Sequence, residues 1–283
     1  MKLKKLVLNI LCFILIIIIL IISFFNNKLI FNVIDDTLYI WIKIVFPSLF
    51  FYLIITDLIL NTNFIKYFSY VFIIFKKIIN PKYLTVFLIS LFTGNPASTN
   101  LINNLYLNKE ISKKEAIYLI NTCSMTSSFF IYNYLGIILN HNLAINFLII
   151  HIISNLGLLI VLKPKCFLRN NYQINNNKKS LLAIIEKNIN ILFIIGGIMI
   201  FFNVIQGILL NYNFKYLPYF LELVTGLKSQ SNLYFKLFLL GFGGISIHIQ
   251  NYQIAKEFMN YKKYFIIKII NGINHILLFF ILF

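Results

Sequence analysis

The hydrophobic and polar positions divide the chain into long apolar runs that are separated by short polar breaks. Several runs reach the roughly 20 apolar residues that a helix needs to cross a bilayer. We expect a membrane-spanning helix in each of them. These runs are Leu6–Phe25, Leu38–Leu60, Ala116–Leu139, Leu143–Leu162, Ile189–Leu210 and Tyr264–Phe283.

The first run follows Lys2, Lys4 and Lys5 and in this respect resembles a secretion signal. Its apolar core is longer than is usual for a signal, and no small-residue cleavage site follows it. The next residues are Asn26, Asn27 and Lys28. We therefore predict that this run stays in the protein as its first helix.

Shorter apolar segments, at 66–79, 83–107, 216–228 and 233–257, are interrupted by glycine, proline or polar residues. A non-helical backbone is tolerated inside a membrane only where protein or a water-filled cavity satisfies its hydrogen bonds. We predict that 83–107 enters the membrane and turns back, with Gly94 and Pro96 at the tip. Helix ends and backbone amides at such a tip are suited to binding a solute.

The chain also suggests an internal repeat. The polar, Asn-rich segment 163–188 divides it almost in half, and aligning Gly94 with Gly244 also aligns Phe51 with Phe201. The crossings between the copies place them in opposite orientations, which is typical of many secondary transporters. We predict an all-α polytopic membrane protein with two inverted repeats, each containing a re-entrant or broken helical hairpin. The expected parts are an N-terminal helix and external loop (1–37), a first repeat (38–162), a cytoplasmic linker (163–188) and a second repeat (189–283).

The break in the second copy reads GFGGISIHIQ, residues 241–250. Gly243 and Gly244 permit a close approach of the backbone. Ser246, His248 and Gln250 alternate with isoleucine, which favours an extended or irregular crossing with one wet side. The alternative is a glycine-rich surface for helix packing.

Composition supports a membrane protein: 60% of the 283 residues are hydrophobic and 12% are charged, against about half and a quarter in soluble domains. The net charge of +17 comes almost entirely from scattered lysines, and Arg169 is the only arginine. Nucleic-acid binding usually relies on arginine and a contiguous basic face, so we exclude it.

Lysine positions instead predict topology, because cytoplasmic loops are enriched in Lys and Arg. The N-terminus, Lys66–Lys82, Lys109–Lys114 and the 163–188 linker are expected inside, and Asp35 and Asp36 outside. The rule weakens at the end of the chain. If a second hairpin is re-entrant, it places Lys256, Lys262 and Lys263 outside.

Four stretches together resemble a known family: IWIKIVFPSLFFYLIITDLIL (40–60), GNPAS, LELVTG (221–226) and GFGGISIHIQ. In this order, over about residues 38 to 275, the chain resembles the YlbJ family of sporulation integral membrane proteins, also called SpoVV, within the nucleoside-recognition Gate-domain group. The chain departs from the family pattern at Phe51 and Tyr52, at Asn95, where the family has an aromatic residue, and at Met125 and Thr126, where it has Ser-Pro.

This resemblance implies transport of dipicolinic acid, a small planar dianion, from the mother cell across the outer forespore membrane during spore formation. The alternatives are a nucleoside-type or ion-coupled transporter of another small solute, and a structural protein that recruits partners through 163–188. We do not expect an enzyme, because Ser246 and His248 lack a nucleophile elbow and no phosphate loop or zinc motif is present. We expect no cofactor or metal, since Cys12, Cys123 and Cys166 lack metal-ligand spacing. A homo-oligomer is left open.

Two candidates carry titratable side chains. Glu222 is an intramembrane carboxylate that could couple transport to protons or cations, or else lie at the lipid interface. His248 could titrate near neutral pH, or else bond a facing carbonyl. We expect Asp57 at the membrane interface. Asn121 and Asn271 either cap or bridge backbone groups of the hairpins or, for at least one of them, join two helices. His151 and His275 have no polar company nearby in the sequence, so we expect them to be structural. The predicted substrate-binding residues are Gly94, Asn95, Pro96, Ser98, Asn121, Glu222, Thr225, Gly243, Gly244, Ser246, His248 and Gln250.

Overall fold

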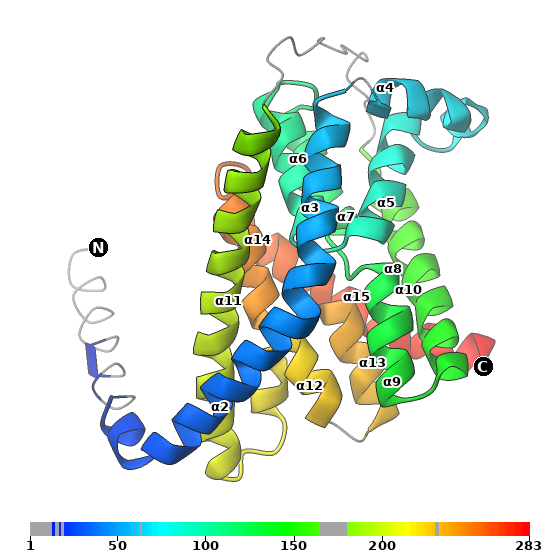
Figure 1. Cartoon of the computed structure of the whole chain (residues 1–283). Coiled ribbons are helices and arrows are strands. Elements are labelled where there is room, and N and C mark those ends of the chain that lie inside the picture. The colour runs from blue at the N-terminus through cyan, green and yellow to red at the C-terminus, as the bar shows by residue number, and fades with distance from the viewer. Residues whose placement is uncertain (1–12, 15–16, 18–19, 63, 165–179, 230–231) are drawn as a thin grey trace, which may run out of the picture.

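The computed structural model describes residues 13–14, 17, 20–62, 64–164, 180–229 and 232–283, and that part of the chain is helical with no strand (Figure 1). The all-α prediction is confirmed for it. Most of the predicted first helix, together with Cys12, Arg169 and Cys166, lies outside the described residues.

Within the described residues, four helices are long and apolar enough to cross a membrane. Three of them confirm predicted spans: α10 (His141–Val161), α11 (Leu181–Asn211) and α15 (Tyr261–Leu282). α11 begins before the predicted Ile189 because the Ser180 side chain accepts a hydrogen bond from Ala183 N and so caps the helix earlier. The predicted linker therefore ends at the start of α11.

The predicted span Leu38–Leu60 is part of a bent helix. It consists of α2 (Asn27–Ile40), the π-helical turn η1 (Trp41–Val45) and α3 (Phe46–Leu60). The two arms meet at 45° and together form a fifth candidate span. Pro47, in the first turn of α3, explains the bend, because proline cannot donate the helical hydrogen bond and clashes with the preceding turn.

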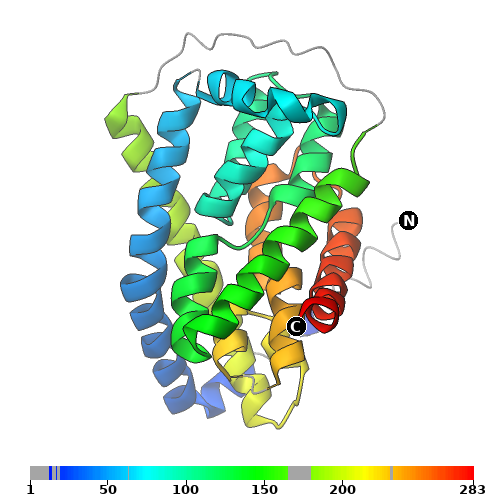
Figure 2. The ribbon, with the colours of Figure 1, turned by 90° about the vertical axis from the view of Figure 1, so that its right-hand side faces the viewer.

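A helical hairpin follows α4 (Phe64–Ser69) and the 3₁₀ segment η2 (Tyr70–Lys77). Its arms are α5 (Pro81–Thr93) and α6 (Ala97–Leu107), of 13 and 11 residues. At 1.5 Å per residue each arm reaches roughly half of a bilayer core. Figures 1 and 2 show both arms between the upper end of the bundle and its middle, so the chain turns back inside the molecule, as predicted.

The prediction of one continuous helix over Ala116–Leu139 is wrong. α7 (Lys113–Cys123) ends, residues 124–127 run without helical structure, and α8 (Ser128–Phe130), η3 (Ile131–Leu135) and α9 (Gly136–Ile138) follow. Serine and threonine at the break favour caps over helix interiors. The Ser127 side chain accepts from Phe130 N and starts the next helix.

The second half also corrects the predicted hairpin. η4 (Leu217–Phe220) and α12 (Leu223–Ser229) pack against each other, with Leu221 and Glu222 at their turn. α13 (Leu233–Phe242) and α14 (Ile245–Ala255) instead form one candidate span, interrupted at 243–244. Gly244 thus lies in a broken span and not at a hairpin tip.

The prediction of an extended stretch at 245–250 is also wrong, because these residues form the first turns of α14. Ser246, His248 and Gln250 alternate with isoleucine because polar side chains lie on more than one face of this helix. Ser246 and His248 are buried within the molecule, and Ile249 is exposed.

Many lysines of the sequence belong to segments at one end of the bundle, which is uppermost in Figures 1 and 2. A hydrophobic cluster there packs Tyr83, Leu105 and Leu159 with Phe258 and Met259 from the turn between α14 and α15. The earlier placement of the last lysines outside is therefore wrong, because α13–α14 crosses the bundle and the short η4–α12 pair turns back. The lysines at this end include Lys66, Lys76, Lys77, Lys82, Lys109, Lys113, Lys114, Lys163, Lys256, Lys262 and Lys263.

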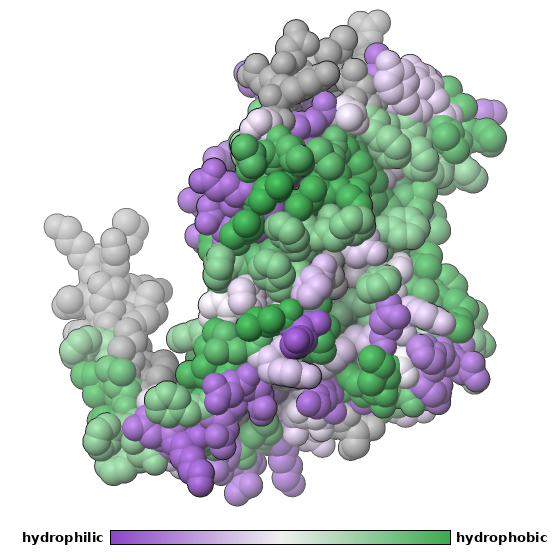
Figure 3. All heavy atoms as spheres, viewed as in Figure 1, coloured by the Kyte–Doolittle hydropathy of each residue, from purple (hydrophilic) through white to green (hydrophobic). Residues whose placement is uncertain are grey.

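The opposite end carries Asp35 and Asp36 on α2, and hydrophilic residues gather there in Figure 3. Hydrophobic residues cover most of α3 on the same face. Large apolar side chains such as Phe51, Phe193 and Phe201 are exposed on the outside of the bundle. This outer surface and the apolar helices are those of a membrane-embedded, multi-pass protein. By the positive-inside rule, we expect its lysine-rich end to face the cytoplasm.

Candidate functional site

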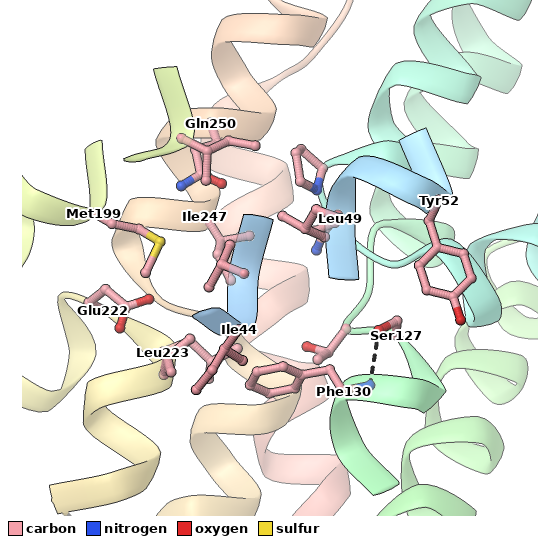
Figure 4. A pocket seen from close by; sticks show the side chains of 16 residues that line it. Ile44, Leu49, Tyr52, Ser127, Phe130, Met199, Glu222, Leu223, Ile247 and Gln250 are labelled. Atoms are coloured by element: carbon pink, nitrogen blue, oxygen red, sulfur yellow. Dashed lines mark hydrogen bonds between the residues drawn. The ribbon is translucent and has the colours of Figure 1, made fainter. Parts of the chain in front are cut away.

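A cavity lies in the interior of the bundle, where the interrupted helices meet (Figure 4). Its walls come from η1 and the start of α3, the tip of the α5–α6 hairpin, the 124–127 break, the η4–α12 turn, α11 and α14. We call it the central cavity. Apart from Tyr52, its polar lining residues are Asn95, Thr126, Ser127, Glu222 and Gln250. The predicted residues Asn95, Pro96, Glu222 and Gln250 are therefore brought together.

The hairpin tip is shaped by Gly94, which has φ +64° and ends α5. A Cβ at this position would lie 2.6 Å from Ser127 N, so the tip and the 124–127 break touch through their backbones. Asn95 N donates to Met125 O of the break at 2.8 Å, and the Asn95–Pro96 peptide bond that follows is cis. The hairpin thereby satisfies one of the carbonyls that the break leaves without a helical partner.

The Asn95 side chain is oriented by its oxygen, which accepts from Ser124 Oγ at 2.9 Å and from the predicted site residue Ser98 Oγ at 3.2 Å. Its amide nitrogen makes no hydrogen bond to any residue that the structure describes. Because Asn95 lines the central cavity, this N–H group is available to a solute.

The turn between η4 and α12 carries Glu222, which is 2% exposed. Thr225 N donates to Glu222 Oε2 at 2.8 Å, and the Thr225 hydroxyl lies 3.0 Å from the same oxygen. The carboxylate therefore caps the start of α12. The chain's own carboxylate thus occupies this helix N-terminus, which is not open to an anionic solute.

The break in α13–α14 contacts the same turn. Gly243 has φ +78°, and a Cβ on Gly244 would lie 2.7 Å from Leu223 N. Ser246 N donates to Leu221 O at 2.9 Å. Gly244 therefore brings the broken span against the η4–α12 turn, as Gly94 brings the hairpin against the first break.

His248 is fully buried, and its Nε2 lies 2.7 Å from Phe242 O at the end of α13. Its Nδ1 and the Ser246 hydroxyl have no hydrogen-bond partner in the described structure. Neither residue lines the central cavity. The geometry favours the alternative in which His248 bonds a facing backbone carbonyl.

A smaller polar cavity lies behind Asn95 and shares Asn95, Thr126 and Ile247 with the central cavity. Lys268 of α15 lines it, and its Nζ donates to Ser124 O at the end of α7. A single charged residue in the apolar run FIIKIINGINHILLFF was the sequence signal for this lysine. Sequence reasoning missed it.

Asn251, Tyr264 and Thr99 complete the polar cluster around Ser124. Asn251 Nδ2 donates to Ser124 Oγ and to Tyr264 OH, both at 2.9 Å. Thr99 Oγ1 donates to Asn251 Oδ1 at 2.8 Å. This cluster ties α6, α7, α14 and α15 together, and no motif in the sequence indicated it.

The remaining predicted asparagines differ in their surroundings. Asn121 is buried on α7 and lines neither cavity. Asn271 Nδ2 donates to Gly241 O at 3.0 Å, so Asn271 bridges to the backbone near the second break as expected. His151 and His275 do have polar company, which corrects our expectation: His151 Nδ1 lies 2.9 Å from His275 Nε2.

Asp57, which we expected at the membrane interface, is 5% exposed and makes an ion pair inside the bundle. Its Oδ2 lies 3.0 Å from Lys187 Nζ and accepts from Asn188 Nδ2 at 3.0 Å. Asn100 of the hairpin donates to Oδ1 at 3.3 Å. This ion pair joins α3, α6 and α11 near the lysine-rich end.

The described residues contain no group of three or more His, Cys, Asp or Glu placed to hold a metal ion. No family model, curated protein or solved structure matches the chain.

Proposed function

We propose that the protein is a membrane transporter that binds a small polar solute in the central cavity. This proposal is supported mainly by the meeting of four interrupted segments at the central cavity or at the smaller polar cavity beside it. These segments are the hairpin tip, the 124–127 break, the η4–α12 turn and the Gly243–Gly244 break. Interrupted backbone inside a membrane is typical of solute sites in secondary transporters.

We further propose that the fold contains two inverted repeats. The α5–α6 hairpin would correspond to η4–α12, the broken α7–α9 span to α13–α14, and α10 to α15. Supporting contacts are reciprocal: Asn95 N donates to Met125 O, and Ser246 N donates to Leu221 O. In this correspondence Gly94 pairs with the Leu221–Glu222 turn and not with Gly244.

For the solute we propose a small planar anion, with dipicolinate as the leading candidate because of the resemblance to the YlbJ family. Asn95 lines the central cavity, its amide nitrogen bonds none of the described residues, and Lys268 lines the adjoining cavity. Both groups bind carboxylates well. This assignment places the protein in the outer forespore membrane.

A nucleoside-type solute is the second candidate. Glu222 and Gln250 offer the central cavity a carboxylate and an amide. These groups pair with the donor and acceptor edge of a base or with hydroxyl groups. A carboxylate in the wall favours such a solute over an anion.

The two candidates are separated by uptake into proteoliposomes. Labelled dipicolinate and labelled uridine are supplied to the wild-type protein and to empty liposomes. Uptake of dipicolinate supports the first assignment, and uptake of uridine alone replaces it with the second. If neither solute moves and neither protects the protein against heating, the transporter proposal fails.

Variants then test the cavity. We expect Asn95→Ala to lower the apparent affinity for dipicolinate about tenfold, the loss of one hydrogen bond to a charged group. Asn142→Ala, an exposed asparagine outside the cavity, is the matched control. Equal uptake by both variants would remove Asn95 from the site. Deletion of the gene in a spore-forming host should lower spore dipicolinate.

A further inference from the structure

Lys268 is a buried lysine to which the described residues offer no carboxylate partner. It is 3% exposed, and the ion pairs found in the described part of the chain are Lys82–Glu110 and Lys187–Asp57. The hydrogen bond from its Nζ to Ser124 O supplies a dipole but no negative charge. A charge inside a membrane is costly unless it is paired, and it marks a functional group by default.

Among the described residues, none of the titratable groups around Lys268 is a carboxylate. Its Nζ lies 5.4 Å from the centre of the Tyr264 ring. The imidazoles can only add positive charge, and the phenol and the thiol are neutral in their usual state at pH 7. The facing groups are Tyr264 and His275 on α15, Cys123 on α7, His151 on α10 and His248 on α14.

The Lys268 side chain is connected to the central cavity through Asn95. Lys268 and Asn95 line the smaller cavity together, and Asn95 also lines the central one. Lys268 also holds the broken end of α7, whose helix-end carbonyls carry partial negative charge. A bound carboxylate beside Asn95 would supply the missing full negative charge.

We propose that Lys268 is the proton-coupling residue of the transporter and that its counter-charge is the solute's carboxylate. This inference rests on the proposed transport function. The neutral amine takes a proton from a hydronium ion in the cavity as the dianion binds, so one proton enters with each dipicolinate and the pair carries a net charge of −1. When the solute leaves, the amine returns the proton to water on the other side.

The test measures net uptake and proton movement in proteoliposomes with the membrane potential clamped. For wild type, an acidic outside should drive accumulation of dipicolinate about tenfold for each pH unit of gradient, as expected for one proton per solute. A pH-sensitive dye inside should acidify in step. Dipicolinate counterflow, the exchange of labelled for unlabelled solute without a gradient, is measured alongside.

We expect Lys268→Met to lose both gradient-driven accumulation and proton movement. Lys268→Arg keeps a charge that does not titrate in proteins, so it should bind dipicolinate, seen as protection against heating, without proton movement. The matched control is Lys236→Met, which removes a buried lysine of α13 that lines neither cavity.

Each outcome is decisive. If wild type transports dipicolinate and Lys268→Met or Lys268→Arg still moves protons with it, the coupling role is overturned while transport stands. If wild type carries uridine but not dipicolinate, the carboxylate partner is overturned. If Lys268→Met does not fold, Lys268→Arg decides the coupling role. If wild type carries neither solute, the transport proposal itself fails.

Discussion

Gly94 is the residue at which the hairpin tip depends on the absence of a side chain. Its φ of +64° is costly for other residues, and its Cα faces the backbone of Ser127. Next to this contact between Gly94 and Ser127, Asn95 N donates a hydrogen bond to Met125 O. A side chain here would strain the turn and push the hairpin away from the break.

We therefore expect Gly94→Ala to destabilise the protein by about 2 kcal/mol or more, the sum of left-handed strain and the forced shift. Thermal unfolding in detergent measures the effect. Gly157→Ala is the control, because Gly157 is in α10 with open space around its Cα. That variant should be neutral or gain up to about 1 kcal/mol. An equal loss in both variants would contradict this account.

At this scale the sequence predicted part of the site. Glycine and proline within apolar runs indicated the 94–96 tip, and a lone acid indicated Glu222. Asn251 and Tyr264 could not be predicted, because each matters through a partner on another helix: Asn251 bonds Ser124. The resemblance drew attention to His248, whose ring bonds a backbone carbonyl instead of facing the cavity.

Among the elements, the hairpin is tied to the long helices by the Asp57–Lys187 pair. Asp57 is on α3, Lys187 is on α11, and Asn100 of α6 joins them. The side chain of Asp57 is 6% exposed and that of Lys187 is 29% exposed. The aspartate is therefore the partner that would suffer more from losing its counter-charge.

A double-mutant cycle with Asp57→Asn and Lys187→Gln tests this link. Each single change should cost about 1 to 2 kcal/mol in unfolding, and the double change should cost less than their sum by at least about 0.5 kcal/mol. The same cycle on the exposed residues Glu186 and Lys114 should show no coupling. Simple additivity at Asp57 and Lys187 would mean that the pair does not hold the elements together.

The element predictions succeeded where apolar runs were long and continuous, as in α10 and α15. They failed at 124–127 because serine and threonine interrupt hydropathy too little to mark a break. They also failed for the second hairpin, since Gly243 and Gly244 match a tip in sequence but lie within a crossing span. Deciding between a tip and a bend needs the direction of the next helix, which local sequence does not contain.

For the whole molecule, the described lysines between helices gather mostly at one end, and the corrected path of α13–α14 extends that bias to the end of the chain. The positive-inside rule then predicts the direction of each membrane crossing. The side of the membrane on which the loops of the second half lie can therefore be tested by chemical labelling.

Labelling of single cysteines from outside intact cells checks this topology, with Cys12, Cys123 and Cys166 replaced beforehand. We expect Lys113→Cys and Lys262→Cys to react only after permeabilisation, and Asp36→Cys and Asn142→Cys to react at once. Reaction of Lys262→Cys in intact cells would return the last lysines to the outer side and contradict the crossing by α13–α14.

The contacts at the two glycine positions have a mechanical consequence. The backbone hydrogen bonds found across them are Asn95 N to Met125 O and Ser246 N to Leu221 O, and the lack of a side chain on Gly94 and Gly244 lets the two backbones come close. In the proposed transporter, one of these junctions can open while the other keeps its hydrogen bond. The solute would then enter from one face while the other face stays closed, which prevents a continuous leak of ions.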